Sequence, residues 1–216
     1  ILLRQGGEHV GNAVKTFETI LNGSTKYVVC GDSDRPVDDI TYKRALEVIA
    51  ITTDGLPDGT RRVSGTTNQI QIAATAIETP TSVSEGYLLV GTTYSGSESR
   101  LYITQYNNTF ETKRLDKTIS DKRLEGVSAA ASDPGFFFIL ANEILGNSKR
   151  NIVLLKLAGD GLEIGDTSFG TSEGDDTGGA VRVLPDGRVA VLGTMELETQ
   201  KKMVLIVMSP DGKFSN

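Results

Sequence analysis

The chain has 216 residues, with 22 Lys and Arg against 28 Asp and Glu, so its formal net charge is −6. This acidic balance argues against nucleic acid as a partner and against electrostatic binding to a membrane surface, because both need basic patches. No apolar run reaches the roughly 18–20 residues that a membrane-spanning helix needs. One cysteine and one histidine exclude an internal disulfide framework and a Cys-rich or multi-histidine metal site.

The dominant pattern is a period of two in short segments rich in Val, Ile, Leu, Tyr and Thr, which predicts β-strands. One such segment recurs four times at intervals of about 50 to 60 residues. Its copies are Tyr27–Gly31, Tyr87–Gly91, Phe137–Ala141 and Val189–Gly193. A glycine-containing turn sequence precedes each copy. Such sequences indicate tight turns, because Gly tolerates a positive φ.

Each repeat predicts strand A, a tight turn, strand B, a polar loop, strand C and a second turn into strand D. Strands A, B and C are, in chain order, Ala13–Ile20, Tyr27–Gly31 and Ala45–Thr52; Ile72–Ile77, Tyr87–Gly91 and Arg100–Tyr106; Val127–Ala131, Phe137–Ala141 and Asn151–Leu157; Ala180–Leu184, Val189–Gly193 and Lys202–Met208. The second turn is signalled at Asp54-Gly55, Asp160-Gly161 and Asp211-Gly212.

Four strands in a repeat of this length are typical of a β-propeller blade. We therefore predict an all-β, four-bladed β-propeller formed by one domain over residues 1–216. The predicted blades cover residues 7–64, 65–119, 120–170 and 171–216. The fourth lacks a strand D, so we expect Ile1–Arg4 to complete it within residues 1–6 and to close the ring. A β-sandwich and an open half of a larger propeller are the alternatives.

Two stretches of the last two repeats carry a resemblance. Asp166–Gly170 and the run from Gly178 to Thr194, which contains Pro185-Asp186-Gly187-Arg188, are similar to bacterial β-propeller repeats of the delta-sixty type. The specific motifs cover about the last third of the chain, and the first two repeats are degenerate. The resemblance implies a propeller in a secreted or surface-attached bacterial protein. It implies no common reaction and no shared catalytic residues.

Functional groups are expected on the longer loops, which join strand D to A and strand B to C on one face. The Asp32–Asp39 loop is the richest in charge. Clustered carboxylates there are a weak indication of Ca²⁺, although the spacing fails the twelve-residue calcium-loop pattern. A solvated loop with an Arg35 ion pair is the alternative. The candidate ligand-binding residues in this loop are Asp32, Asp34, Arg35, Asp38 and Asp39.

The remaining candidates are Tyr94, in a predicted loop, and an acidic group formed by Glu173, Asp175 and Asp176. An exposed Tyr94 is able to stack on a sugar or contact a protein, whereas local packing is the alternative. His9 has no identifiable orienting partner, and Cys30 lies in an apolar strand that predicts burial. We therefore assign no catalytic residue, no metal ligand and no cofactor beyond the weak Ca²⁺ indication.

These observations predict a non-enzymatic binding or scaffolding module that contacts a protein or glycan through its long-loop face. A carbohydrate-active hydrolase or lyase using Asp/Glu pairs on that face is the alternative. A purely structural domain of a larger surface assembly is a third interpretation. The resemblance implies an extracytoplasmic location, in the periplasm or at the cell surface. Residue 1 is Ile, so we expect a processed or trimmed chain in which the lack of a visible signal peptide is uninformative.

Overall fold

The computed structural model describes residues 9–18, 25–36, 42–64, 71–78, 87–107, 113–119, 121–132, 135–146, 148–198 and 200–214. All regular elements in these ranges are β-strands, so the all-β class is confirmed. Within the same ranges, no helix has the length and apolar character needed to cross a membrane.

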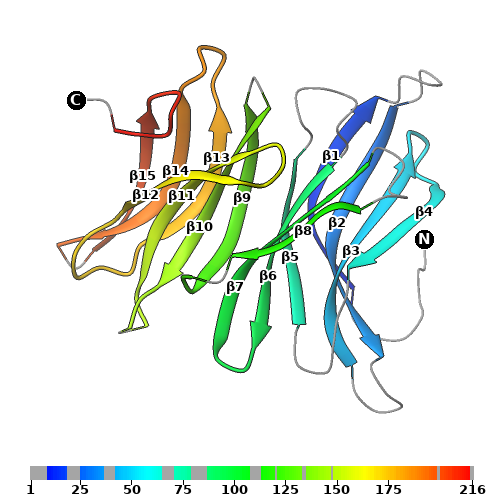
Figure 1. The fold of residues 1–216 in the computed structure, drawn as a ribbon, viewed down its shortest axis with the longest axis horizontal. Coiled ribbons are helices and arrows are strands. Elements are labelled where there is room, and N and C mark those ends of the chain that lie inside the picture. The colour runs from blue at the N-terminus through cyan, green and yellow to red at the C-terminus, as the bar shows by residue number, and fades with distance from the viewer. Residues whose placement is uncertain are drawn as a thin grey trace.

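The strands form four antiparallel sheets, each a simple up-and-down meander (Figure 1). Sheet 1 contains β1 (His9–Glu18), β2 (Thr25–Pro36), β3 (Tyr42–Thr52) and β4 (Pro57–Ser64). Sheet 2 contains β5 (Gln71–Glu78), β6 (Tyr87–Ser95), β7 (Glu98–Tyr106) and β8 (Lys113–Ile119). Sheet 3 contains β9 (Leu124–Ser132), β10 (Phe136–Ile144), β11 (Arg150–Ala158) and β12 (Glu163–Phe169). Sheet 4 contains β13 (Thr177–Val183), β14 (Val189–Leu197) and β15 (Gln200–Met208).

The repeated apolar segments lie where the sequence predicts them, in β2, β6, β10 and β14. Each of these strands is internal to its sheet and pairs on both sides, which explains its apolar content. The predicted tight turns are confirmed at Gly55, Gly161 and Gly212, whose φ values are +83°, +78° and +70°. These turns are also closed by backbone hydrogen bonds, such as Gly161 N to Ala158 O at 2.8 Å.

Neighbouring sheets pack face to face, and the described residues define the apolar seams of two of these junctions. The seam between sheets 2 and 3 contains Leu88, Val90, Phe137, Ile139 and Leu155, among others. The seam between sheets 3 and 4 contains Phe138, Leu140, Leu154, Val181 and Val191, among others. Sheet 3 therefore uses alternate residues of the same strands on opposite faces, as the two-residue period requires. This face-to-face packing is sandwich-like.

The prediction of a closed four-bladed propeller is wrong. The sheets form an open row, with β1 (blue) and β15 (red) at opposite ends of the molecule (Figure 1). In the described part of the chain, sheet 4 has three strands, ordered β13-β14-β15. Extensive contacts between sheets join only neighbours in the row. Large side chains hold successive sheets face to face in a row, and among the described residues no extensive contact joins sheet 4 to sheet 1.

The strand predicted to close the ring, Ile1–Arg4, lies outside the described residues.

The loops between strands B and C are shorter than expected. For example, the loop predicted around Tyr94 covered residues 92–99, but β6 and β7 extend through most of it and leave only the Gly96-Ser97 turn. Polar Ser and Thr side chains made these segments resemble loops, but their backbones pair as strands.

Candidate functional site

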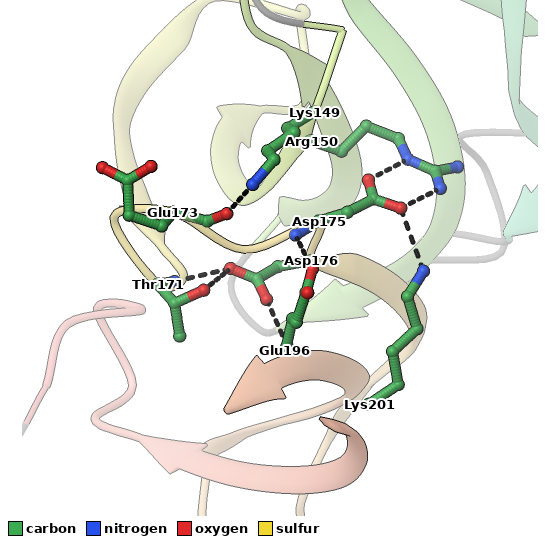
Figure 2. Close-up of polar contacts among 8 residues, drawn as sticks. All are labelled: Lys149, Arg150, Thr171, Glu173, Asp175, Asp176, Glu196 and Lys201. Carbon is green, nitrogen blue, oxygen red and sulfur yellow. Dashed lines mark hydrogen bonds and ion pairs between the residues drawn. The ribbon is translucent and has the colours of Figure 1, made fainter. Parts of the chain in front are cut away.

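The connection between sheets 3 and 4, residues 170–176, carries the best-defined polar site. It leaves β12 and enters β13, and it is the longest connection whose residues are all described. Two adjacent carboxylates, Asp175 and Asp176, end this loop. Figure 2 shows that their partners come from separate strands and from the start of the loop itself.

Asp175 joins the two sheets through charged side chains. Its Oδ1 and Oδ2 atoms accept hydrogen bonds from Arg150 Nε and Nη2, both at 2.8 Å. Its Oδ2 atom also accepts from Lys201 Nζ at 3.0 Å. Arg150 begins β11 in sheet 3 and Lys201 lies in β15 of sheet 4. This bidentate geometry gives a strong and directional ion pair.

Asp176 is fully buried, at 0% exposure, and organises the loop backbone. Its Oδ2 atom accepts from Thr171 N at 2.5 Å and from Thr171 Oγ1 at 3.1 Å. Its Oδ1 atom accepts from Glu196 N at 2.7 Å, and its own N–H donates to Arg150 O at 2.8 Å. We call Asp175, Asp176 and these partners the carboxylate latch.

The latch has a defined electrostatic consequence. The hydrogen bonds from the Arg150 guanidinium, followed by those from Lys201, hold the pKa of the Asp175 carboxyl well below its usual range. The same contact raises the pKa of Arg150. Asp175 is therefore a permanently ionised structural carboxylate at neutral pH, and it lacks the raised pKa that a general acid needs.

Beside the latch lies a surface hollow of about 620 Å³. Its lining comes from the β10–β11 connection, the β12–β13 loop and the β14–β15 hairpin, and consists of Lys149, Thr171, Ser172, Glu173, Gly174, Glu196, Leu197, Glu198 and Lys202. Glu198 holds a left-handed backbone with φ +51°, as two-residue hairpins require. Three glutamates and two lysines make the hollow polar and mixed in charge, and none of its lining residues is aromatic.

The latch also positions one wall of the hollow. Asp175 N donates to Glu196 Oε2 at 2.9 Å, which fixes the Glu196 side chain. Lys149 Nζ donates to the carbonyl of Glu173. The loop wall is therefore held from both sides, and the hollow exists without a bound partner to order it.

Of the predicted site residues, the structure brings Asp175 and Asp176 together in the latch. Asp32, Asp34 and Arg35 lie in strand β2, paired with β3, and do not form a loop. Asp38 and Asp39 lie outside the described residues. Tyr94 lies in β6 of sheet 2, opposite Ser99 and away from the hollow, and it is partly buried.

The described residues contain no group of three or more His, Cys, Asp and Glu side chains able to hold a metal ion. The weak Ca²⁺ indication rests partly on Asp38 and Asp39, and it stays an untested prediction. Cys30 is buried, as predicted.

Sequence reasoning missed most partners of the two carboxylates. Arg150, Glu196 and Lys201 are 20 to 26 residues away from the aspartates they bind. One signal was available: the three residues flank the β10–β11 and β14–β15 connections, which lie at the same end of the sheets as the loop of the two aspartates. The motif residues of the resemblance have packing roles, since Phe169 joins the seam between sheets 3 and 4. Asp166 pairs with Lys122 at 2.5 Å.

No family model matches the chain, and no curated protein is similar enough to match it. The resemblance to delta-sixty-type repeats therefore stays a prediction. One solved structure, described as a glucose dehydrogenase, is 11% identical, with a TM-score of 0.36 over 85% of this chain and 77% of that chain. A likeness this distant carries no argument about the fold or activity of this chain.

Proposed function

We propose that the chain is a non-enzymatic binding module that contacts a polar segment of a partner protein through the hollow beside the carboxylate latch. The observation that carries this proposal is the preformed hollow itself, walled by a loop that is fixed from two sheets. A rigid wall lowers the entropy lost on binding. The setting we propose, following the sequence resemblance, is a secreted or cell-surface protein.

The chemistry of the lining favours a protein segment over a glycan. Lys149, Lys202 and three glutamates offer both signs of charge at short range, which suits a polar peptide carrying both acidic and basic groups. Glycan sites commonly add an aromatic ring as a stacking surface, and no lining residue supplies one. The alternative of a carbohydrate-active hydrolase gains no support from Asp175 and Asp176, because their oxygen atoms already accept hydrogen bonds within the protein.

A peptide-display selection against the immobilised chain tests the proposal. We expect selected peptides to carry mixed charge and to bind a Glu173→Lys/Lys202→Glu double variant at least about tenfold more weakly, because both substitutions reverse charges that line the hollow. The control is Glu163→Lys on β12, an exposed charge reversal outside the hollow, which should leave binding unchanged.

Two results would overturn the proposal. Selected peptides that bind the double variant as tightly as the parent chain would place the binding surface elsewhere. A parallel glycan array that yields a ligand lost in the double variant would make the hollow a glycan site, and turnover of that glycan would make the chain an enzyme.

A further inference from the structure

The two ends of the row of sheets carry apolar side chains that are more exposed than their counterparts inside the row. Each sheet has a preceding face, toward the sheet before it in the chain, and a following face, toward the sheet after it. In sheet 3, Leu140, Ile152 and Leu154 lie on the following face and are 0–2% exposed, because sheet 4 covers them. The same positions can be located one repeat later in sheet 4.

Strand register makes this correspondence definite. Leu140 pairs with Leu154 in sheet 3, and Leu192 pairs with Leu205 in sheet 4. Ile152 pairs with Asn142, and its counterpart Met203 pairs with Thr194. The following face of sheet 4 therefore repeats an interface that the molecule already uses between sheets 3 and 4.

In sheet 4 this face is open. Met203 is 79% exposed and Leu205 is 69% exposed, and Leu192 and Val207 are exposed beside them. Three of these side chains alternate along the edge strand β15, and the fourth is cross-strand to Leu205. Adjacent exposed apolar side chains of this kind mark an interaction surface on a soluble protein.

The opposite end of the row shows the complementary feature. Tyr27 in sheet 1 is 37% exposed, whereas its repeat counterparts Tyr87 and Phe137 are 1% and 2% exposed. Phe137 packs in the seam against sheet 2, the sheet that precedes its own. Val29 shares this face by alternation, and Ile49 and Ile51 share it by cross-strand pairing. All three are partly buried. These residues form the preceding face of sheet 1.

We propose that the partner of these faces is a second copy of this chain, which docks the preceding face of its sheet 1 onto the following face of sheet 4. The contact would continue the sheet-to-sheet packing already present along the row. It joins different surfaces of the two copies, so it is a head-to-tail contact that builds either closed or extending assemblies.

Light scattering coupled to size-exclusion chromatography tests the proposal on the 216-residue chain. We expect a mass of at least two chains that falls on dilution. Leu205→Asp and Tyr27→Asp should each weaken association by roughly tenfold to a hundredfold, since each places a charge in an apolar contact. Leu162→Asp is the control, because Leu162 is exposed in the turn between β11 and β12, away from both end faces.

Mixing the two variants distinguishes head-to-tail contact from contact between like faces. The Leu205→Asp copy keeps an intact sheet 1 face and the Tyr27→Asp copy keeps an intact sheet 4 face, so the mixture should form a dimer that grows no further. Association of Tyr27→Asp alone, with no gain on mixing, would show that sheet 4 faces pair with each other and would overturn the proposal. A monomeric parent chain up to millimolar concentration would overturn it as well.

Circular dichroism checks that each variant is folded. A second measurement avoids charged variants altogether. A photoreactive amino acid at Met203 should capture peptides from β2 or β3 of another chain. Capture confined to other regions, or no capture between chains, would contradict the proposed contact.

Discussion

At the scale of single residues, Asp176 shows why a carboxylate is needed in an interior position. Both of its oxygen atoms face donors: the Thr171 N–H and hydroxyl on one side, and the Glu196 N–H on the other. An asparagine presents one acceptor and one donor, so Asp176→Asn must set an amide N–H against a backbone N–H. Such a buried mismatch cannot be relieved by water, because the side chain is fully covered.

We therefore expect Asp176→Asn to lower the free energy of unfolding by about 1–3 kcal/mol. Urea denaturation followed by circular dichroism measures the change. Glu163→Gln makes the same chemical substitution at an exposed position and should leave the urea midpoint almost unchanged. Equal midpoints for Asp176→Asn and Glu163→Gln would show that the latch does not stabilise the fold.

Asp175 predicts a pH dependence with a definite sign. Its pKa is lowered in the folded state, chiefly by Arg150, so folding favours the ionised form. The stabilisation is complete above the unfolded pKa of about 4 and is lost as the pH falls toward the folded pKa. We expect the chain to lose stability below about pH 4. Asp166, whose pKa Lys122 lowers, contributes in the same direction.

The matched variant is Asp175→Asn, which cannot ionise. Urea midpoints of the variant and the parent chain should differ most near neutral pH and converge as the pH falls toward 2. A difference that stays constant across this pH range would mean that the Asp175 ion pairs contribute nothing to stability.

At the scale of elements, the strands were predictable because two independent signals mark each of them. Apolar and polar residues alternate along the strand, and turn residues flank it. The recurring segment that ends at Gly31, Gly91 and Gly193 lies in an inner strand of its sheet. Loop lengths were less predictable. Ser and Thr in Thr92–Ser99 suit a hairpin as well as a loop, and only pairing with the neighbouring strand distinguishes the two. Asp175 and Asp176 were identified, but their partners were not, since contacts between strands far apart in sequence depend on the packing of the sheets.

The loop of the latch depends on one position without a side chain. Gly174 is buried against Thr171 and Glu196, and a Cβ atom placed there would lie 1.9 Å from Thr171 Oγ1. We expect Gly174→Ala to displace Thr171 from Asp176 and to destabilise the chain by roughly 1–3 kcal/mol, the range of an overpacked site. Thermal denaturation measures the loss. Gly165→Ala in β12, where a Cβ meets nothing within 4 Å, is the control, and an equal effect of both substitutions would contradict the prediction.

At the scale of the whole molecule, the sheets form a one-dimensional stack in which each sheet is supported mainly by its neighbours. The sequence could not reveal that the row stays open. Ring closure depends on the rotation between successive sheets, and that rotation is set by the fit of side chains such as Phe137 and Leu140 across the seams. A repeat pattern in the sequence specifies the strands of each sheet, but it does not specify the rotation between successive sheets.

The stack predicts where stability is concentrated. In repeat architectures, units with neighbours on both sides are held by two interfaces, while terminal units are held by one. Sheet 3 is covered on both faces, and the middle residues of its inner strands β10 and β11 are buried. Sheet 4 is covered on one face, and β15 is its edge strand. Hydrogen exchange of the Leu205→Asp chain at low concentration, where the proposed contact between copies is weakened, isolates this intrinsic difference.

We expect amides in β10 and β11 to exchange at least about tenfold more slowly than paired amides in β14, a difference of about 1.4 kcal/mol in opening free energy. In the parent chain at high concentration, exchange in β14 and β15 should slow toward that of sheet 3, because a second copy then covers the following face. Mass spectrometry of peptides spanning residues 136–158 and 189–208 resolves the two regions. Uniform protection across both regions in the Leu205→Asp chain would show that the row unfolds as a single cooperative unit and not from its open end.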